Sequence, residues 1–158
     1  MSGVVVLGAG QAGLQLASSL RELGYDDDVT LVGDEPFAPY QRPPLSKAYL
    51  AGSVPEAMLF MQEPAYFEQH RIAFRASNAA VAVDRALHQV DLASGAFLTY
   101  DHLVFATGTR NRVLPCVEGE MAGVLSLRTL DDARNLSAAI VTAERIVVIG
   151  AGFLGLEA

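Results

Sequence analysis

The stretch Val4-Val5-Val6-Leu7-Gly8-Ala9-Gly10-Gln11-Ala12-Gly13 decides the fold of this chain. Its consecutive apolar residues, mostly β-branched, predict a strand buried on both faces, as in a parallel sheet. Apolar residues then recur at helical spacing as far as Leu23, and Gly24 marks the end of that helix. A second apolar strand is expected from Val29 to Val32. Residues 3–34 therefore predict a β-α-β unit with parallel strands and a right-handed crossover.

The glycines between this strand and helix have the spacing G-x-G-x-x-G. The first glycine of such a turn permits a tight bend, the second lets the backbone approach a pyrophosphate, and the third allows close packing of helix and strand. The N–H groups at the helix N-terminus also favour phosphate. The pattern recurs after the apolar run 146–149, where a strand is expected. The candidate cofactor-binding residues are Gly8, Gly10, Gln11, Ala12 and Gly13 in the first turn, and Gly150, Gly152 and Gly155 in the second.

Two matches are far more specific than one. With 14 glycines in 158 residues, a bare match is expected by chance roughly 0.1 times in a chain of this kind. An acid that binds a ribose hydroxyl is expected about 20 residues after the turn. Asp34 and Glu35 lie there, and Asp34 is preferred because it comes first, although it could instead be a solvated turn acid beside Pro36. Two such sites in one chain indicate FAD together with NAD(P)H.

The rest of the chain predicts further short elements. A proline-rich loop covers residues 36–44, and Gly119 and Gly123 lie in a linker. Pro64 can occupy the first turn of a helix. A turn at Ser94-Gly95 joins two strands of a hairpin. Helices are expected over 45–50, 64–70 and 130–142, the last with Thr129 as N-cap, and strands near 72–74, 81–83, 89–92, 97–100 and 103–106.

Composition excludes several functional classes. The net charge of −7 and a pI near 4.8 argue against nucleic-acid binding. No apolar run is long enough to span a membrane, and the start of the chain lacks the basic region of a secretory signal. Cys116 is the single cysteine, which excludes a disulfide framework, a cysteine zinc site and an internal redox dithiol, and favours a reducing, cytoplasmic setting. His70, His88 and His102 show no ligand spacing, so no metal site is expected.

The segment Pro39-Tyr40-Gln41-Arg42-Pro43-Pro44-Leu45-Ser46-Lys47 resembles a signature of the ferredoxin, putidaredoxin and rubredoxin reductases that serve oxygenase systems. Three further segments match: Ala106-Thr107-Gly108, residues 127–133 and residues 150–157. The resemblance covers essentially the whole chain. It implies an α/β fold, with a doubly wound FAD-binding domain and a β-meander over residues 1–118. A linker and the beginning of an NAD-binding domain would follow over 119–158, so the chain is expected to be the first part of a longer reductase.

The resemblance also implies which residues contact the cofactors. The pyrophosphate of FAD is expected along Ala9 to Gly13, and NADH, with NADPH not excluded, in the second turn. Lys47 would lie beside the flavin ring, where a cation stabilises negative charge on the reduced ring, and Glu157 would orient that lysine. These two are the expected catalytic residues. Further FAD contacts are implied at Asp34 or Glu35, Arg42, Ala80, Ala106, Thr107, Gly108 and Arg128.

The function implied is electron transfer from NADH through FAD to a ferredoxin or rubredoxin. Flavin disulfide reductases carry a cysteine pair where this chain has Arg42 to Lys47, and Cys116 is interpreted as a small apolar filler. Three alternatives remain open: an NADH oxidase or peroxide-reducing flavoenzyme, a regulatory flavoprotein of the apoptosis-inducing-factor type, and an inactive FAD-binding fragment. The sequence leaves the oligomeric state open.

Overall fold

The computed structural model describes residues 3–112, 114 and 121–157. Cys116, Gly119 and the expected domain boundary after residue 118 lie outside the described residues. The chain divides into two compact units. The first comprises Met1–Tyr40 and Phe60–Gly108, and the second comprises Gln41–Leu59 and Thr109–Ala158. The proline-rich motif therefore starts in one unit and ends in the other.

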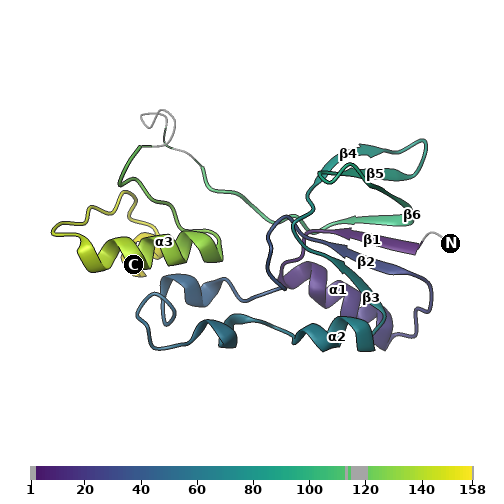
Figure 1. Cartoon of the computed structure of the whole chain (residues 1–158), viewed down its shortest axis with the longest axis horizontal. Coiled ribbons are helices and arrows are strands. Elements are labelled where there is room, and N and C mark those ends of the chain that lie inside the picture. The colour runs from purple at the N-terminus through teal and green to yellow at the C-terminus, as the bar shows by residue number, and fades with distance from the viewer. Residues whose placement is uncertain (1–2, 113, 115–120, 158) are drawn as a thin grey trace. The chain divides into compact units, whose positions relative to one another are not determined.

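A single six-stranded sheet forms the first unit, in the order β3-β2-β1-β6-β5-β4 (Figure 1). β1 pairs in parallel with β2 and β6, and β2 pairs in parallel with β3. The other two pairs, β4 with β5 and β5 with β6, are antiparallel and form the expected meander. This confirms the predicted α/β class. The elements are β1 (Gly3–Leu7), α1 (Gln11–Glu22), β2 (Val29–Val32), α2 (Pro64–Gln69), β3 (Ile72–Arg75), β4 (Ala80–Asp84), β5 (Gln89–Leu92) and β6 (Phe97–Phe105).

β1 is buried along its whole length, as its continuous apolar run predicts. Alternate side chains of a strand point to opposite faces, so Val4 and Val6 enter one apolar cluster and Val5 and Leu7 another. The first cluster includes residues of α1 and α2, which lie on the same side of the sheet in Figure 1. The second includes Val90 of β5 together with other residues of the meander. Both faces of the central strand are therefore covered within this unit.

β6 differs from the two short strands expected over 97–100 and 103–106. It is one nine-residue strand whose first part pairs with β5 and whose second part pairs with β1. The polar residues Asp101 and His102 are exposed and interrupt the apolar pattern, but the strand continues through them. The register with β1 shifts there, because Tyr100 is opposite Gly3 and His102 is opposite Val4. Phe105 is also exposed (66%), so the expectation of a buried strand end is wrong for this side chain.

The second unit contains the short 3₁₀ helices η1 (Pro43–Ser46) and η2 (Glu56–Leu59) and the α-helices α3 (Leu130–Thr142) and α4 (Phe153–Glu157). Thr129 caps α3, as predicted: its side chain accepts a hydrogen bond from the Asp132 N–H, and the Asp132 carboxylate accepts one from the Thr129 N–H. These reciprocal bonds satisfy N–H groups that a helix start leaves without partners.

Two expectations for this unit are wrong. The helix expected over 45–50 is replaced by η1 followed by turns. The backbone bonds there are irregular, because the N–H groups of Lys47 and Tyr49 both donate to the Pro44 carbonyl instead of forming an α-helical ladder. Residues 146–149 are not assigned to a strand. A strand requires a hydrogen-bonded neighbour, and none of the strand pairs among the described residues involves this segment.

Candidate functional site

The first glycine turn connects the end of β1 to the start of α1. Gly8 has a φ of +113°, which L-residues with side chains rarely adopt. A Cβ at Gly8 would also lie 2.2 Å from the carbonyl oxygen of Ala106, which follows β6. Gly8 therefore allows the turn to bend sharply while it touches the neighbouring strand end.

Gly13 and Gly10 have different surroundings. A Cβ on Gly13 would lie 2.0 Å from the carbonyl oxygen of Gly8 and 3.1 Å from Leu31, so this glycine lets α1 pack tightly on the strands. A Cβ on Gly10 would meet nothing within 4 Å. Gly10 is the N-cap of α1, and no side chain caps the helix start. The turn thus leaves open space at Gly10, where α1 begins, and the N–H groups of a helix start can bind an anion.

Other predicted residues lie at the same carboxyl ends of the parallel strands. The Gly8 N–H donates to the Val32 carbonyl, and the Ala106 N–H donates to the Leu7 carbonyl. Ala106 is partly buried, Thr107 and Gly108 are exposed, and Gly108 has a φ of +66°. Ligands of open α/β sheets bind at this edge, where neighbouring strands meet helices on different sides. The structure therefore gathers the first turn and residues 106–108 in one place.

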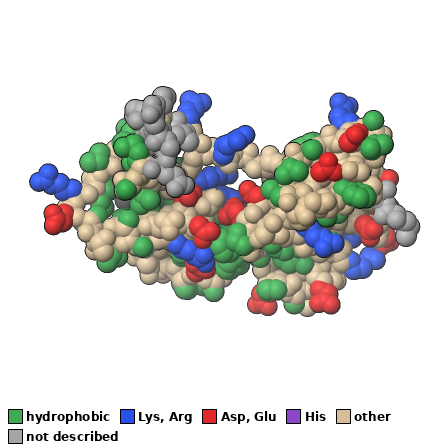
Figure 2. Space-filling model, turned by 45° about the horizontal axis from the view of Figure 1, so that its top comes forward, with side chains coloured by type: hydrophobic (Ala, Val, Ile, Leu, Met, Phe, Trp, Pro, Cys, Tyr) green, Lys and Arg blue, Asp and Glu red, His purple; other side chains and the backbone are tan. Residues whose placement is uncertain are grey.

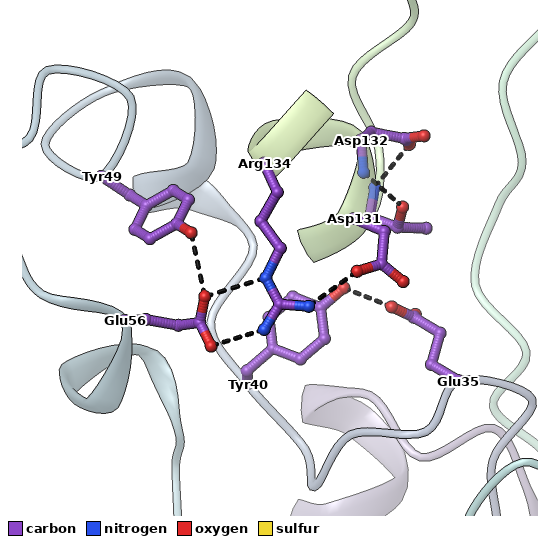
Figure 3. Close-up of polar contacts among 8 residues, drawn as sticks. Glu35, Tyr40, Tyr49, Glu56, Asp131, Asp132 and Arg134 are labelled. Atoms are coloured by element: carbon purple, nitrogen blue, oxygen red, sulfur yellow. Dashed lines mark hydrogen bonds and ion pairs between the residues drawn. The ribbon is translucent and has the colours of Figure 1, made fainter. Parts of the chain in front are cut away.

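The two candidate acids follow β2. Asp34 is exposed, and Glu35 is partly buried. The Tyr40 hydroxyl donates to the Glu35 carboxylate at 2.6 Å (Figure 3). This hydrogen bond indicates that Glu35 helps to stabilise the loop. Asp34 is then the acid that is exposed to solvent.

Ala80, predicted only from the resemblance, also lies near this edge. It begins β4 and packs against the apolar cluster that contains Leu7 and Val32. The segment before it is bonded to the acid-bearing loop, because the Asn78 N–H donates to the Gly33 carbonyl and the Ser77 N–H to that of Glu35. The first unit therefore brings together every predicted site residue that it contains.

The second unit holds a separate group of predicted residues. The Arg42 guanidinium donates to the Arg128 carbonyl at 2.9 Å, and the Arg128 guanidinium donates to the Thr109 carbonyl at 3.0 Å. The Asp132 carboxylate also accepts the Arg128 N–H, at 2.9 Å. The cap of α3 thus fixes the backbone of Arg128, which in turn contacts Arg42.

Lys47 and Glu157 are in contact, as the resemblance implies. The Lys47 Nζ lies 3.2 Å from one carboxylate oxygen of Glu157. The Ser46 hydroxyl donates to the other oxygen at 3.0 Å. The lysine side chain is 55% exposed and the glutamate 31%. This geometry leaves the lysine accessible while its partner is held on two sides.

The second glycine turn has nearly the local geometry of the first. Gly150 has a φ of +115°, and a Cβ on Gly155 would lie 2.1 Å from the Gly150 carbonyl oxygen. A Cβ on Gly152 meets nothing within 4 Å, like that on Gly10. The Leu156 N–H donates to the Gly152 carbonyl at 3.1 Å, matching the first helical bond of α1. The two turns differ at the first glycine, because a Cβ on Gly150 meets nothing within 4 Å whereas one on Gly8 would clash with Ala106. They are equivalent in backbone conformation and in the roles of the second and third glycines.

Sequence reasoning missed a charged cluster in the second unit (Figure 3). Arg134 of α3 donates two hydrogen bonds to the Glu56 carboxylate, at 3.0 and 2.6 Å, and a third to Asp131 at 2.8 Å. The Tyr49 hydroxyl donates to Glu56 at 3.0 Å. Glu56 and Arg134 lie far apart in the sequence, and no spacing rule connects them.

The cluster shifts the ionisation of its members. Hydrogen bonding to Arg134 lowers the pKa of the Glu56 carboxyl. Burial, and after it the hydrogen bond to Glu56, raises the pKa of the Tyr49 phenol. Hydrogen bonding to Glu56 raises the pKa of the Arg134 guanidinium. The cluster therefore stays charged around neutral pH and ties η2 to α3.

No helix among the described residues is long and apolar enough to cross a membrane. Within those residues, His, Cys, Asp and Glu side chains form no group that could hold a metal ion.

Hydrophobic side chains reach the surface on the face drawn in Figure 2. Val147, Ile149 and Phe153 are among the most exposed, at 82%, 71% and 88%.

A family model, described as pyridine nucleotide-disulphide oxidoreductase, matches residues 2–158. Rhodocoxin reductase of Rhodococcus erythropolis is 46% identical over 154 residues, covering 98% of this chain and 36% of that protein. Putidaredoxin reductase CamA of Pseudomonas putida is 40% identical over 157 residues, covering 98% of this chain and 37% of that protein. The chain therefore spans well under half the length of these relatives.

Solved structures agree with this similarity. The ferredoxin reductase for the CYP199A2 system from Rhodopseudomonas palustris is 42% identical, with a TM-score of 0.94 over 99% of this chain and 39% of that chain. The reductase in a covalent putidaredoxin reductase–putidaredoxin complex is 39% identical, also with a TM-score of 0.94, over 99% of this chain and 38% of that one. Both sequence and fold are thus shared with reductases of electron-carrier proteins.

Proposed function

Because this chain belongs to the pyridine nucleotide-disulphide oxidoreductase family, we propose that it holds FAD in an enzyme that passes electrons from NADH to a ferredoxin or rubredoxin. The FAD site of the proposal is the first glycine turn with Asp34, Ala80 and residues 106–108. The NADH site is the second turn, with Gly150, Gly152 and Gly155. NADPH remains an alternative donor.

The geometry of the first turn carries this proposal. Gly8 and Gly13 are confined by close backbone contacts, whereas Gly10 has open space where a side chain would be. A packing role would explain Gly8 and Gly13 but not Gly10. Open space over the start of α1 fits a pyrophosphate, whose oxygens would accept hydrogen bonds from the helix N–H groups. The open space at Gly10 supports the proposal that this turn binds a dinucleotide.

Lys47 and Glu157 take the catalytic roles in the proposal. FAD, when bound, supplies the conversion of a two-electron hydride donation into single-electron transfer. The Lys47 cation would stabilise negative charge on the reduced ring, and Glu157 would fix its position. Arg42 and Arg128 would add positive charge for the same cofactor. Support for these roles comes from the 3.2 Å Lys47–Glu157 contact and the Arg42–Arg128 bond.

The proposal also covers organisation and partners. Residues 1–118 would form the FAD-binding part and 119–158 a linker with the beginning of the NAD-binding part. The carrier is proposed from relatives named as reductases of putidaredoxin and rubredoxin. A reducing, cytoplasmic setting is proposed from the single cysteine of the sequence.

Matched glycine variants test the assignment of the two turns. Gly10→Ala adds a methyl group into open space at a φ of −94°, so the fold should be retained. The same methyl group should obstruct the pyrophosphate and weaken FAD binding by tenfold or more, roughly 1.4 kcal/mol. Gly152→Ala makes the equivalent change in the second turn and should leave FAD affinity unchanged. FAD titration followed by flavin fluorescence, after gel filtration of each variant, measures both.

Each outcome has a clear consequence. Equal FAD affinity for wild type and Gly10→Ala would contradict the proposed FAD site. Loss of FAD binding only in Gly152→Ala would assign FAD to the second turn and NADH to the first. Retained flavin without any NADH oxidation by the chain would favour the alternative of a fragment that binds FAD and is inactive.

A further inference from the structure

Ser46 is one of two polar residues that are buried among the residues the structure describes, the other being Ser18. Ser46 is only 3% exposed and ends η1, directly before Lys47. Its hydroxyl donates to a carboxylate oxygen of Glu157 at 3.0 Å. A buried hydroxyl shielded from water needs such a partner, and a charged acceptor makes the bond stronger than a neutral one.

The two oxygens of Glu157 have different partners. Oε2 accepts from Ser46, and Oε1 faces the Lys47 ammonium. Consecutive residues of η1 and its cap therefore hold a single carboxylate. The Ser46 bond fixes the rotation of the carboxylate, so that the other oxygen points to the lysine.

Packing does little to hold Glu157 in place. α4 has five residues and none of them is buried. Phe153 and Leu156 of this helix are 88% and 77% exposed. An exposed ion pair alone is worth little, because water and side-chain entropy compete with it. The bond to the buried Ser46 hydroxyl is thus the most protected contact that Glu157 makes.

We propose that Ser46 is a positioning residue: its hydroxyl orients the Glu157 carboxylate and thereby keeps the Lys47 ammonium in place. This inference deepens the proposed function, since it rests on the role given there to Lys47 and Glu157. Ser46 itself is not assigned a contact with substrate or cofactor. Its effect passes through Glu157 to the lysine.

The sequence offers a direct measurement, because Lys47 is its only lysine. An ammonium group held beside a carboxylate is acylated more slowly than a free amine. The labelling rate of the Lys47 peptide by an N-hydroxysuccinimide ester, followed by mass spectrometry, therefore reports on the contact. The α-amine of the same chain serves as an internal reference for reagent concentration.

Ser46→Ala should raise the Lys47 labelling rate about threefold, the scale of one lost hydrogen bond. Ser18→Ala is the matched control, because Ser18 is also buried and its hydroxyl also has a side-chain partner, Tyr66 at 2.8 Å. It should lower stability by a similar amount and leave the labelling rate unchanged. In a Glu157→Gln background, where the charge pair is already lost, Ser46→Ala should add little.

Ser46→Cys covers the case in which the alanine variant does not fold. A thiol has nearly the shape of the hydroxyl but is a weak donor, so an intermediate rate is expected. Unchanged labelling in both Ser46 variants would overturn the inference. An equal increase in Ser18→Ala would do so too, because the effect would then reflect general loosening of the chain.

The labelling requires no flavin, so it separates this inference from the proposed function. FAD affinity is measured on the same samples. Labelling that responds to Ser46 in a chain that binds no FAD supports the positioning role and contradicts the FAD site. If the chain binds FAD but the labelling rate does not change in the Ser46 variants, the result supports the FAD site and contradicts the positioning role.

Discussion

Gly10 and Gly13 lie in the same turn, yet an added methyl group meets different surroundings at each. At Gly13 the nearest atom would be the Gly8 carbonyl oxygen, 2.0 Å away, and backbone must move to relieve the clash. Gly13→Ala should therefore lower the free energy of unfolding by about 2–3 kcal/mol, as other overpacked sites do. Urea denaturation measures this, with Gly10→Ala as the control. Equal stability of both variants would mean that α1 can shift away from β1 without cost.

Asp34 and Glu35 can be separated by their hydrogen bonds. Glu35 accepts a bond from Tyr40, whereas Asp34 is exposed at the end of β2. Asp34→Ala should weaken FAD binding by about 1–3 kcal/mol, the scale of a lost hydrogen bond to a charged group. Isothermal titration with FAD measures the change, and Glu35→Gln is the control. A larger loss of affinity in Glu35→Gln would transfer the ribose contact to Glu35.

Glu56 makes stability depend on pH through its bonds to Arg134. Its folded pKa is lowered from the ordinary value of 4.5. The unfolded chain therefore binds a proton first as the pH falls, and the stabilising effect is present above pH 4.5 and is lost as the pH falls through the folded pKa.

Denaturation of wild type and Glu56→Gln across this range tests the sign. Wild type should be more stable at neutral pH by about 0.5–1 kcal/mol, because the pair is partly exposed. The difference should shrink as the solution is acidified below 4.5. Arg134→Gln should remove the same dependence. A difference that grows towards acid pH would show that the ion pair does not determine it.

At the scale of elements, α3 begins at a well-defined cap. Thr129→Ala removes the acceptor for the Asp132 N–H and should destabilise the chain by about 1 kcal/mol. Thr129→Ser keeps the hydroxyl and should retain most of the stability. Thermal unfolding followed by circular dichroism compares them. Identical melting temperatures for all three proteins would mean that α3 does not unfold together with the rest of the chain.

Local patterns predicted most of the helices and strands. The continuous apolar run of β1, the spacing of α1 and the N-cap of α3 each appear in consecutive residues, so the sequence alone identifies them. The hairpin turn of the meander was predictable from Ser94-Gly95, and Gly95 adopts a φ of +84° in the turn between β5 and β6. These features depend on neighbours within a few positions.

Features that depend on distant residues were not predictable in the same way. The length of β6 reflects two different partners, β5 and β1, and the absence of a strand at 146–149 reflects the absence of any partner strand among the described residues. The Glu56–Arg134 pair joins η2 to α3, and neither residue stands in a recognisable motif. Periodicity describes how one segment would be buried, not which segment it will contact.

Predicted site residues fall between these two cases. Gly8, Gly10 and Gly13 were identified from the mechanics of a turn. The contacts around Gly8 and Gly13 agree with a tight bend and close helix packing, and the phosphate role of Gly10 stays a prediction. The contact between Lys47 and Glu157 was expected only from the family resemblance, and the structure brings the two together. Ser46 was part of the recognised motif, but only its burial and its bond to Glu157 distinguish it.

At the scale of the whole molecule, a net charge of −7 coexists with exposed apolar side chains from Ile146 to Leu156. Exposed apolar groups that lie close together promote association. Val147→Glu, at a side chain that is 82% exposed, should reduce self-association of the chain and change its stability by no more than about 0.5 kcal/mol.

Sedimentation velocity at several concentrations measures that association. Val6, which is fully buried in β1, provides the contrast. Val6→Ala should cost about 2 kcal/mol or more of stability without reducing association. Unchanged sedimentation of Val147→Glu would exclude this segment as the contact between copies.

β1 comes first in the sequence and lies between β2 and β6, and that order affects how the chain folds. β2 follows within one helix, whereas Leu7 must find Phe105 across nearly the whole first unit. Closing so long a loop costs entropy before any stabilising contact forms, so proteins with many contacts between distant residues fold more slowly. During synthesis the first glycine turn would emerge early but gain its neighbour Ala106 only after the meander has left the ribosome. The first glycine turn therefore reaches its final surroundings only when β6 pairs with β1. Refolding of the chain should be slow compared with the formation of α1 itself.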